Sequence, residues 1–277
     1  MEMEKNVNTT KKLGVSFQSN YSNLELHVYG DTIDELIDGL SRLKDGAFID
    51  YFVFKFEKRL TEEQLSRLDE IMITTYNAEQ IVMYAERRKD KINTQKYQDR
   101  LIELKDMWRL VKFTSFAIGA DIEKTEDAVI AYGDARRAND LLEEVDSVNI
   151  KKMKKFIFEK AEPYEVYSYI RYLKRKKIAI NINDIFEAKK IVIQSQDMQT
   201  IRFWADGIGD VEEMQDITIQ YGDAWDMYGF AKEVENADIE KIRISINKTN
   251  EKDVIQRFND KFPKPIIKRN FFNMFKK

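Results

Sequence analysis

The segment DMWRLVKFTSFAIGADIEK at residues 106–124 matches DAWDMYGFAKEVENADIEK at residues 223–241 without a gap. Both segments carry Trp two positions after the initial Asp and Phe seven positions after it, and both end in Ala-Asp-Ile-Glu-Lys. A match of this kind at a fixed frame indicates an internal repeat, which is the signature of a stacked repeat architecture.

The same frame recurs at seven origins, spaced between 26 and 35 residues apart: Asn77, Asp106, Asp134, Glu162, Asp197, Asp223 and Glu251. The residues four, seven and eleven positions after each origin are apolar in every case except Arg88. These offsets place side chains on one stripe of an α-helix. The origins are mostly Asp or Asn, which are favourable N-cap residues. The frame therefore predicts that each origin caps a helix A.

A second helix B is expected to begin sixteen residues after the origin, at Ile122, Ile150, Ile178 or Ile239. For the 35-residue interval, Asn183 is the expected cap of a late helix B that runs to about Gln194. A helix pair of this size cannot bury both faces alone and must stack on its neighbours. We predict a mainly α fold, an α-solenoid of about seven two-helix repeats over residues 61–262.

Two strings of this array carry a family resemblance, FAKEVENADIEKI at 230–242 and FTSFAIGADIEKT at 113–125. They resemble the degenerate HEAT-like helical repeats of Gram-positive bacteria and their phages. The resemblance implies an interaction-type solenoid without catalytic residues. It further implies that the chain is a phage or mobile-element protein, which would bind a host or defence protein and occlude it.

Residues 13–60 are expected to form a small α+β module. Alternating apolar and polar residues around Asn20-Tyr-Ser-Asn predict a β-hairpin, and Asp31 is the expected cap of the next helix. The segment 50–57 fits two structures. Its alternating Phe residues favour a third strand, giving a ββαβ-like module, whereas the repeat frame projected back to Asp45 favours a helix. We take the strand as the expectation. Thr61 and Gln64 predict a capping box for the helix that follows.

The composition bounds the class of protein. The chain has 277 residues, 34% of them charged, with a formal net charge of −3 and no Cys. Without Cys there is no disulfide framework and no thiol nucleophile, which fits the cytoplasm. The sequence lacks an apolar run long enough to span a membrane. We expect residues 1–12 to be a flexible N-terminus, and residues 263–277 to be a basic, aromatic tail that seals the last repeat or touches a membrane surface.

Catalytic chemistry finds little support. His27 is the single histidine and lies in a predicted strand, without the G-x-S-x-G pattern of a serine hydrolase. The sequence therefore predicts a protein that is not an enzyme, with no cofactor, no catalytic residues and no metal site. The acidic residues between Asp206 and Asp226 are interpreted as a solvated helix face rather than a calcium site.

Aromatic residues outside the apolar stripe are the preferred candidates for partner binding. The position two residues after the origin points away from the stripe of helix A. It is occupied by Trp108, Arg136, Tyr164 and Trp225 in four of the repeats. Aromatic residues and Arg are enriched among interface anchors. We therefore expect a protein partner at these side chains, unless neighbouring A helices bury the rings.

A nucleic-acid-binding solenoid is the alternative. The segment 151–177 is strongly basic, and we expect its two clusters to lie side by side and to contact phosphates. The candidate residues are Lys151, Lys152, Lys154, Lys155, Lys174, Arg175, Lys176 and Lys177. A homo-oligomer is a further expectation, because the basic segment and the acidic segment can pair between chains.

Overall fold

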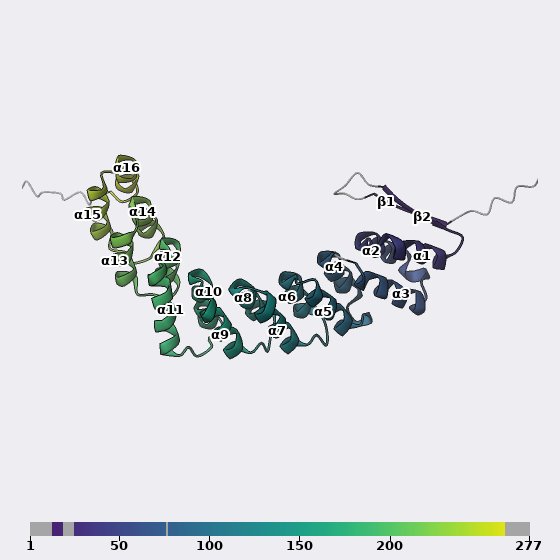
Figure 1. Cartoon of the computed structure of the whole chain (residues 1–277). Helices are drawn as coiled ribbons and strands as arrows, with labels where there is room; N and C mark the ends of the chain where they lie inside the picture. Colours follow the sequence, from purple (N-terminus) through teal and green to yellow (C-terminus); the bar gives the residue numbers. More distant parts are fainter. Residues whose placement is uncertain (1–12, 19–24, 76, 264–277) are drawn as a thin grey trace, which may run out of the picture. The chain divides into compact units, whose positions relative to one another are not determined.

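The computed structural model describes residues 13–18, 25–75 and 77–263, and these residues are mainly helical. They form sixteen α-helices, two 3₁₀ helices and one antiparallel pair of strands (Figure 1). The chain divides into two compact units, Met1–Phe156 and Ile157–Lys277, which are described separately. None of the described helices is long and apolar enough to cross a membrane.

The first unit contains β1 (Leu13–Gln18), β2 (Glu25–Gly30), α1 (Ile33–Leu43), α2 (Gly46–Phe56), η1 (Glu57–Arg59), α3 (Glu62–Ile73), α4 (Ala78–Arg88), η2 (Lys89–Lys91), α5 (Thr94–Glu103), α6 (Met107–Phe116), α7 (Ile122–Tyr132) and α8 (Ala135–Glu144). The helix α9 (Ile150–Lys160) crosses the boundary between the units. The second unit contains α10 (Pro163–Arg175), α11 (Ile182–Ser195), α12 (Met198–Gly207), α13 (Val211–Tyr221), α14 (Ala224–Glu233), α15 (Ile239–Thr249) and α16 (Lys252–Lys261).

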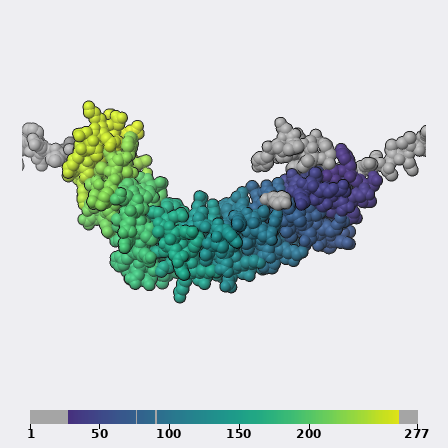
Figure 2. Space-filling view, viewed as in Figure 1, coloured from purple at the N-terminus to yellow at the C-terminus, as the bar shows by residue number. Residues whose placement is uncertain are grey.

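Within each unit the helices form two layers. In the first unit α2, α4, α6 and α8 pack in sequence, each against the next, and α3, α5 and α7 lie in the other layer (Figure 1). In the second unit α10, α12, α14 and α16 pack in the same way. Figure 2 shows the colours of the sequence changing gradually within each unit, without mixing of early and late segments. Each helix pair therefore contacts mainly its neighbours in the chain.

The repeat frame predicted the starts of the even-numbered helices correctly. All seven predicted origins are N-caps, of α4, α6, α8, α10, α12, α14 and α16. The residue seven positions after each origin is buried in every repeat, from Tyr84 to Phe258. The side chains of Glu162 and Glu251 make no capping hydrogen bond, so at these two origins the frame locates the helix but not the cap chemistry.

Arg88, the one polar residue on the predicted stripe, is buried and forms an ion pair with Asp69. Its guanidinium contacts both carboxylate oxygens of Asp69, at 3.3 Å from Nε and 3.2 Å from Nη2. The hydroxyl of Tyr84 donates to the same carboxylate at 2.7 Å. Burial lowers the pKa of Arg88, but the hydrogen bond and charge of Asp69 outweigh it and raise the pKa. Asp69 therefore compensates the charge of Arg88, which allows Arg88 to occupy a buried position on the stripe.

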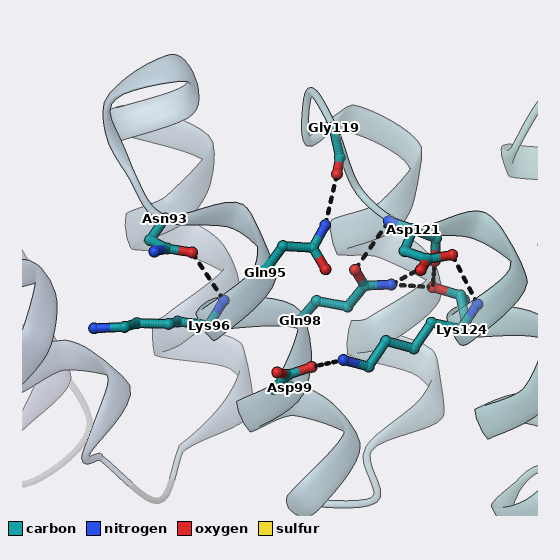
Figure 3. A network of polar contacts seen from close by, with 9 residues as sticks. Asn93, Gln95, Lys96, Gln98, Asp99, Gly119, Asp121 and Lys124 are labelled. Atoms are coloured by element: carbon teal, nitrogen blue, oxygen red, sulfur yellow. Dashed lines mark hydrogen bonds and ion pairs between the residues drawn. The ribbon is translucent and has the colours of Figure 1, made fainter.

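A buried side chain links successive odd-numbered helices. In Figure 3, Gln98 of α5 accepts from the N–H of Asp121 at 3.0 Å and donates to its carbonyl at 2.6 Å. Asp121 is the N-cap of α7. Gln215 of α13 makes the same pair of bonds to Asp238, the N-cap of α15. The arrangement, which we call the glutamine clasp, holds the start of one odd-numbered helix against the middle of the preceding odd-numbered helix.

Lysine and aspartate flank the glutamine clasp. Lys124 pairs with Asp99, and Lys241 pairs with Asp216 at the equivalent place in the second unit. These pairs account for the lysine of the repeated Ala-Asp-Ile-Glu-Lys string, whose aspartate is the N-cap. The string is therefore the sequence signature of a helix whose first turn packs on the preceding odd-numbered helix.

The expectation of a strand at 50–57 was wrong, because Asp50 to Phe56 lie in α2 and Glu57 begins η1. The N-cap of α2 is Asp45, as the projected repeat frame indicated. Phe52 is buried whereas Phe54 is 73% exposed, so the alternating rings do not share one face. Packing of the helical stripe against α3 and α4 outweighs the local alternation of the sequence.

The remaining N-terminal elements differ in detail from the expectation. β1 pairs antiparallel with β2, and β2 packs on α1, where a Cβ on Gly39 would lie 2.5 Å from Val28 Cγ1. The N-cap of α1 is Thr32 rather than Asp31. Thr61 and Gln64 form the predicted capping box of α3. Since α1 and α2 both contact α3, these two helices pack within the same compact unit as the helices that follow.

The late helix B of the long interval is α11, whose N-cap is Asn181 rather than Asn183. The helix ends at Ser195, close to the expected residue. Most of the extra residues of this repeat lie in its two helices, since α10 and α11 have 13 and 14 residues, whereas α6 and α7 have 10 and 11. The predicted N-terminus at 1–12 and all but the first residue of the predicted tail at 263–277 lie outside the described residues.

Candidate functional site

The three candidate rings are about half exposed in the structure. Trp108 on α6 is 44% exposed, Tyr164 on α10 is 48% exposed and Trp225 on α14 is 46% exposed. Each lies in the first turn of an even-numbered helix. Each also contacts a side chain of the next even-numbered helix. The neighbouring repeat therefore covers one part of each ring and leaves the rest to solvent.

Trp108 is covered by a cation from α8. The guanidinium of Arg137 lies 5.3 Å from the centre of the indole ring, within the range of a cation–π contact. Arg137 also pairs with Asp140 one turn later in α8. Arg136, the predicted site residue, is exposed and makes no polar contact within the part of the chain that the structure describes. The stacking cation is therefore the residue after the predicted one.

Trp108 and Arg136 line one groove, with a volume of about 930 Å³. One wall is the turn into α6 together with its first turn, and the other is the turn from α7 into α8. A second cation–π contact joins the walls, since Lys105 Nζ lies 4.9 Å from the ring centre of Tyr132. We call this surface the basic–aromatic groove. Each wall supplies one ring and one cation to the opposite wall.

Carboxylates in the basic–aromatic groove are already engaged. Asp106 accepts from the backbone N–H of Arg109 at 3.0 Å, and Asp134 accepts from the N–H of Arg137 at 2.8 Å. These two N-caps are the acidic residues in the groove, against the four basic residues Lys105, Arg109, Arg136 and Arg137. The lining residues therefore carry an excess of positive charge, and because Arg109 and Arg137 pair with Glu79 and Asp140 beside the groove, Lys105 and Arg136 are the cations left to a ligand.

Trp225 has a similar cation but acidic surroundings. The guanidinium of Arg257 from α16 lies 5.3 Å from the indole centre, and Tyr228 packs edge-on against the indole at 6.1 Å. Asp223 and Asp226 form a reciprocal capping box beside the ring. The second unit therefore repeats the pairing of Trp and Arg, here beside two carboxylates.

Tyr164 belongs to an aromatic cluster. Its ring centre lies 6.1 Å from Tyr167 on the same helix and 6.0 Å from Phe203 on α12. Burial raises the pKa of Tyr167, although the nearby Arg171 lowers it. This position lacks a stacked cation among the contacts that the structure gives for the ring, and it is the most apolar of the three.

No protein family, curated protein or solved structure matches this chain.

The basic candidates of segment 151–177 have mixed environments. Lys152 Nζ bridges Asp127 at 2.7 Å and the buried Glu126 at 3.1 Å, and Lys174 Nζ donates to the carbonyl of Gly207 at 2.9 Å. Further interactions engage three more of them: Lys154, Lys155 and Arg175. The exposed residues without a polar partner in the described part of the chain are Lys151, Lys176 and Lys177.

The two basic clusters belong to different compact units, Lys151 to Lys155 to the first and Lys174 to Lys177 to the second. Their predicted side-by-side arrangement stays a prediction. Elsewhere, His27 lies in β2 opposite Ser16. Among the described residues, no three His, Asp or Glu side chains gather as metal ligands would.

Three residues that form the cation–π contacts of the basic–aromatic groove were not predicted from the sequence: Lys105, Tyr132 and Arg137. A signal for Tyr132 was present, because Tyr-Gly-Asp-Ala occurs at 132–135 and again at 221–224. Both tyrosines end an odd-numbered helix and are about half exposed. Lys105 has no counterpart of this kind, because its role depends on the pairing of two turns in space.

Proposed function

We propose that this protein is a non-enzymatic, protein-binding scaffold in which stacked helix pairs form an α-solenoid. The observation that supports it best is the shared arrangement of Trp108 and Trp225. Each indole is 44–46% exposed, and each lies 5.3 Å from an Arg of the next even-numbered helix. In this proposal the rings are the anchors of the interface, and the partner is occluded rather than chemically modified.

The physical argument concerns the exposed area of the rings. Trp and Tyr provide large contact area with few rotatable bonds, and Trp, Tyr and Arg dominate the binding energy of protein interfaces. The stacked Arg restricts each indole before binding, so less conformational entropy is lost on association. A partner that covers the free part of the ring would gain contact area at low entropic cost.

Nucleic-acid binding through segment 151–177 has weaker support. Lys152 and Lys174 already satisfy carboxylate and carbonyl partners within the protein. A phosphate contact would have to replace these interactions. The exposed Lys151, Lys176 and Lys177 are the basic residues through which this alternative can be tested.

Affinity capture with matched baits tests the proposal. The wild-type protein and a Trp108→Ala, Trp225→Ala variant are immobilised at equal density and exposed to a lysate of the native host. We expect a protein that the wild type retains and the double variant loses, with the thermal unfolding of both baits unchanged. Retention of the same proteins by both baits would contradict the proposed role of the two rings.

A further inference from the structure

The basic–aromatic groove continues into a second groove over neighbouring repeats. A furrow of about 620 Å³ shares Leu104, Asp106 and Arg109 with it and reaches the first turn of α4 and the turn before α2. Both lie within the first compact unit. Together they form one surface depression across the starts of α4, α6 and α8, which is a shape that suits an extended chain.

The chemistry of the depression changes along its length. At the α6–α8 end, Trp108 and Tyr132 are exposed beside Lys105 and Arg136, and Arg136 has no polar partner among the described residues. At the α4 end, Glu79 pairs with Arg109 at 3.3 Å, and its carboxylate lies on the surface. Positive charge is therefore concentrated at one end, where it adjoins the two rings.

Resting on the proposed protein-binding function, we propose that the basic–aromatic groove binds an extended acidic segment of the partner protein. Carboxylates of this segment pair with Arg136 and Lys105, and its apolar side chains pack on Trp108 and Tyr132. A planar guanidinium matches a carboxylate through two parallel hydrogen bonds. The existing cation–π contacts hold Lys105 and Arg137 in place across the groove before the segment binds.

The charge pattern favours a peptide over a nucleic-acid strand. A nucleic acid places a phosphate at every nucleotide and would bring a row of negative charges along the whole depression. Two carboxylates, Asp45 and Glu79, line its α4 end against the single cation Lys44, so this end disfavours such a row. A peptide can place its carboxylates only where Arg136 and Lys105 lie and present uncharged side chains elsewhere.

Fluorescence anisotropy with the full-length chain tests the inference. The probe is a fluorescein-labelled peptide of repeated Glu-Phe-Gly, compared with a Lys-Phe-Gly peptide and with oligothymidylate of matched length. We expect the acidic peptide to bind in preference to both others, and its affinity to fall as salt rises.

Two charge-reversal variants, one on α8 and one on α6, provide a matched comparison, and a third variant removes an exposed ring. Arg136→Glu is expected to weaken binding of the acidic peptide by about tenfold, and Trp108→Ala by a similar factor. Lys112→Glu makes the same change of charge on α6 outside the groove lining, and we expect an effect of less than about twofold. Unchanged thermal unfolding establishes that each variant is folded.

Three results would overturn the inference: no binding of the acidic peptide, equal effects of Arg136→Glu and Lys112→Glu, or Arg136-dependent binding of oligothymidylate. These results are separable from failure of the proposed function. If one of these results is found but a protein is still captured from lysate through Trp108 and Trp225, the proposed protein-binding function is retained and only the proposal of an acidic segment is rejected.

Discussion

The carboxamide of Gln98 satisfies both backbone polar groups of Asp121, accepting from its N–H at 3.0 Å and donating to its C=O at 2.6 Å. Gln98 is fully buried, so water cannot replace it in these bonds. Asp121 caps α7 with its own side chain. One side chain of α5 therefore fixes where the next odd-numbered helix begins, and Gln215 does the same for α15.

The glutamine clasp is expected to stabilise the first unit. Gln98→Leu leaves the N–H and C=O of Asp121 without their partner, and we expect the free energy of unfolding to fall by about 2–4 kcal/mol. Chemical denaturation measures this change. Gln95→Leu is the control, because Gln95 lies on the same helix but is exposed, with one bond to the carbonyl of Gly119. Equal losses in the two variants would contradict the role of the clasp.

The buried ion pair of Arg88 and Asp69 gives a second prediction. Arg88→Leu leaves a buried carboxylate without its cation, so we expect a loss of about 3–5 kcal/mol in the free energy of unfolding. Arg67→Leu removes a surface cation that contacts Asp34 and Asp38, and here we expect about 1 kcal/mol or less. Denaturant titration of both variants compares the two. A small effect of Arg88→Leu would indicate that the stripe tolerates the unpaired carboxylate.

Lys152 is predicted to act in stability rather than in phosphate binding. Its ammonium bridges Asp127 and the buried Glu126, so we expect Lys152→Ala to cost about 1–3 kcal/mol and the adjacent, exposed Lys151→Ala to cost less than about 0.5 kcal/mol. Burial lowers the pKa of Lys152, but its hydrogen bonds to Asp127 and Glu126 outweigh it and raise the pKa above the ordinary 10.5.

The raised pKa sets the pH dependence of this contribution. A cation whose pKa is higher in the folded state stabilises the protein fully below its unfolded pKa and loses this effect as the pH rises through the folded pKa. We therefore expect the difference between wild type and Lys152→Ala to be present at neutral pH and to shrink as the solution becomes alkaline. Thermal melts between neutral and alkaline pH measure it, and a difference that stays constant through the alkaline range would contradict the assignment.

Nucleic-acid binding is tested through the exposed basic residues. The triple variant Lys151→Glu, Lys176→Glu, Lys177→Glu reverses the charges that lack a polar partner among the described residues. The scaffold account predicts that wild type and variant both bind oligothymidylate weakly and to a similar extent. A salt-sensitive affinity that the variant abolishes would instead support the nucleic-acid alternative. An electrophoretic mobility shift at two salt concentrations distinguishes the outcomes.

Periodicity predicted the helices well, because burial follows the helical repeat directly. The frame located all seven N-caps from Asn77 to Glu251. It also placed Asp45 before α2, where the alternating Phe residues misled the strand prediction. Local alternation is a weaker signal than seven recurrences of a helical stripe, because the burial of Phe52 but not Phe54 depends on packing against α3 and α4.

The exposure of the candidate rings was predictable from the sequence, because the distance of Trp108, Tyr164 and Trp225 from the N-cap places them outside the buried stripe. Their role in binding stays a prediction. The stacked cations were not predictable, because Arg137 reaches Trp108, and Lys105 reaches Tyr132, across the gap between two repeats. The clasp carried a readable signal, since Gln98 and Gln215 each lie 23 residues before the aspartate that they bind.

Site-specific photo-crosslinking tests the central claim most directly. Benzoylphenylalanine replaces Trp108 in one variant and Ile244 in another, since Ile244 is also well exposed but lies on the odd-numbered helix α15, whereas the candidate rings lie on even-numbered helices. After irradiation in a lysate of the native host, the account predicts a discrete protein adduct from position 108 and none from position 244. Identical adducts from both positions, or none from position 108, would contradict it.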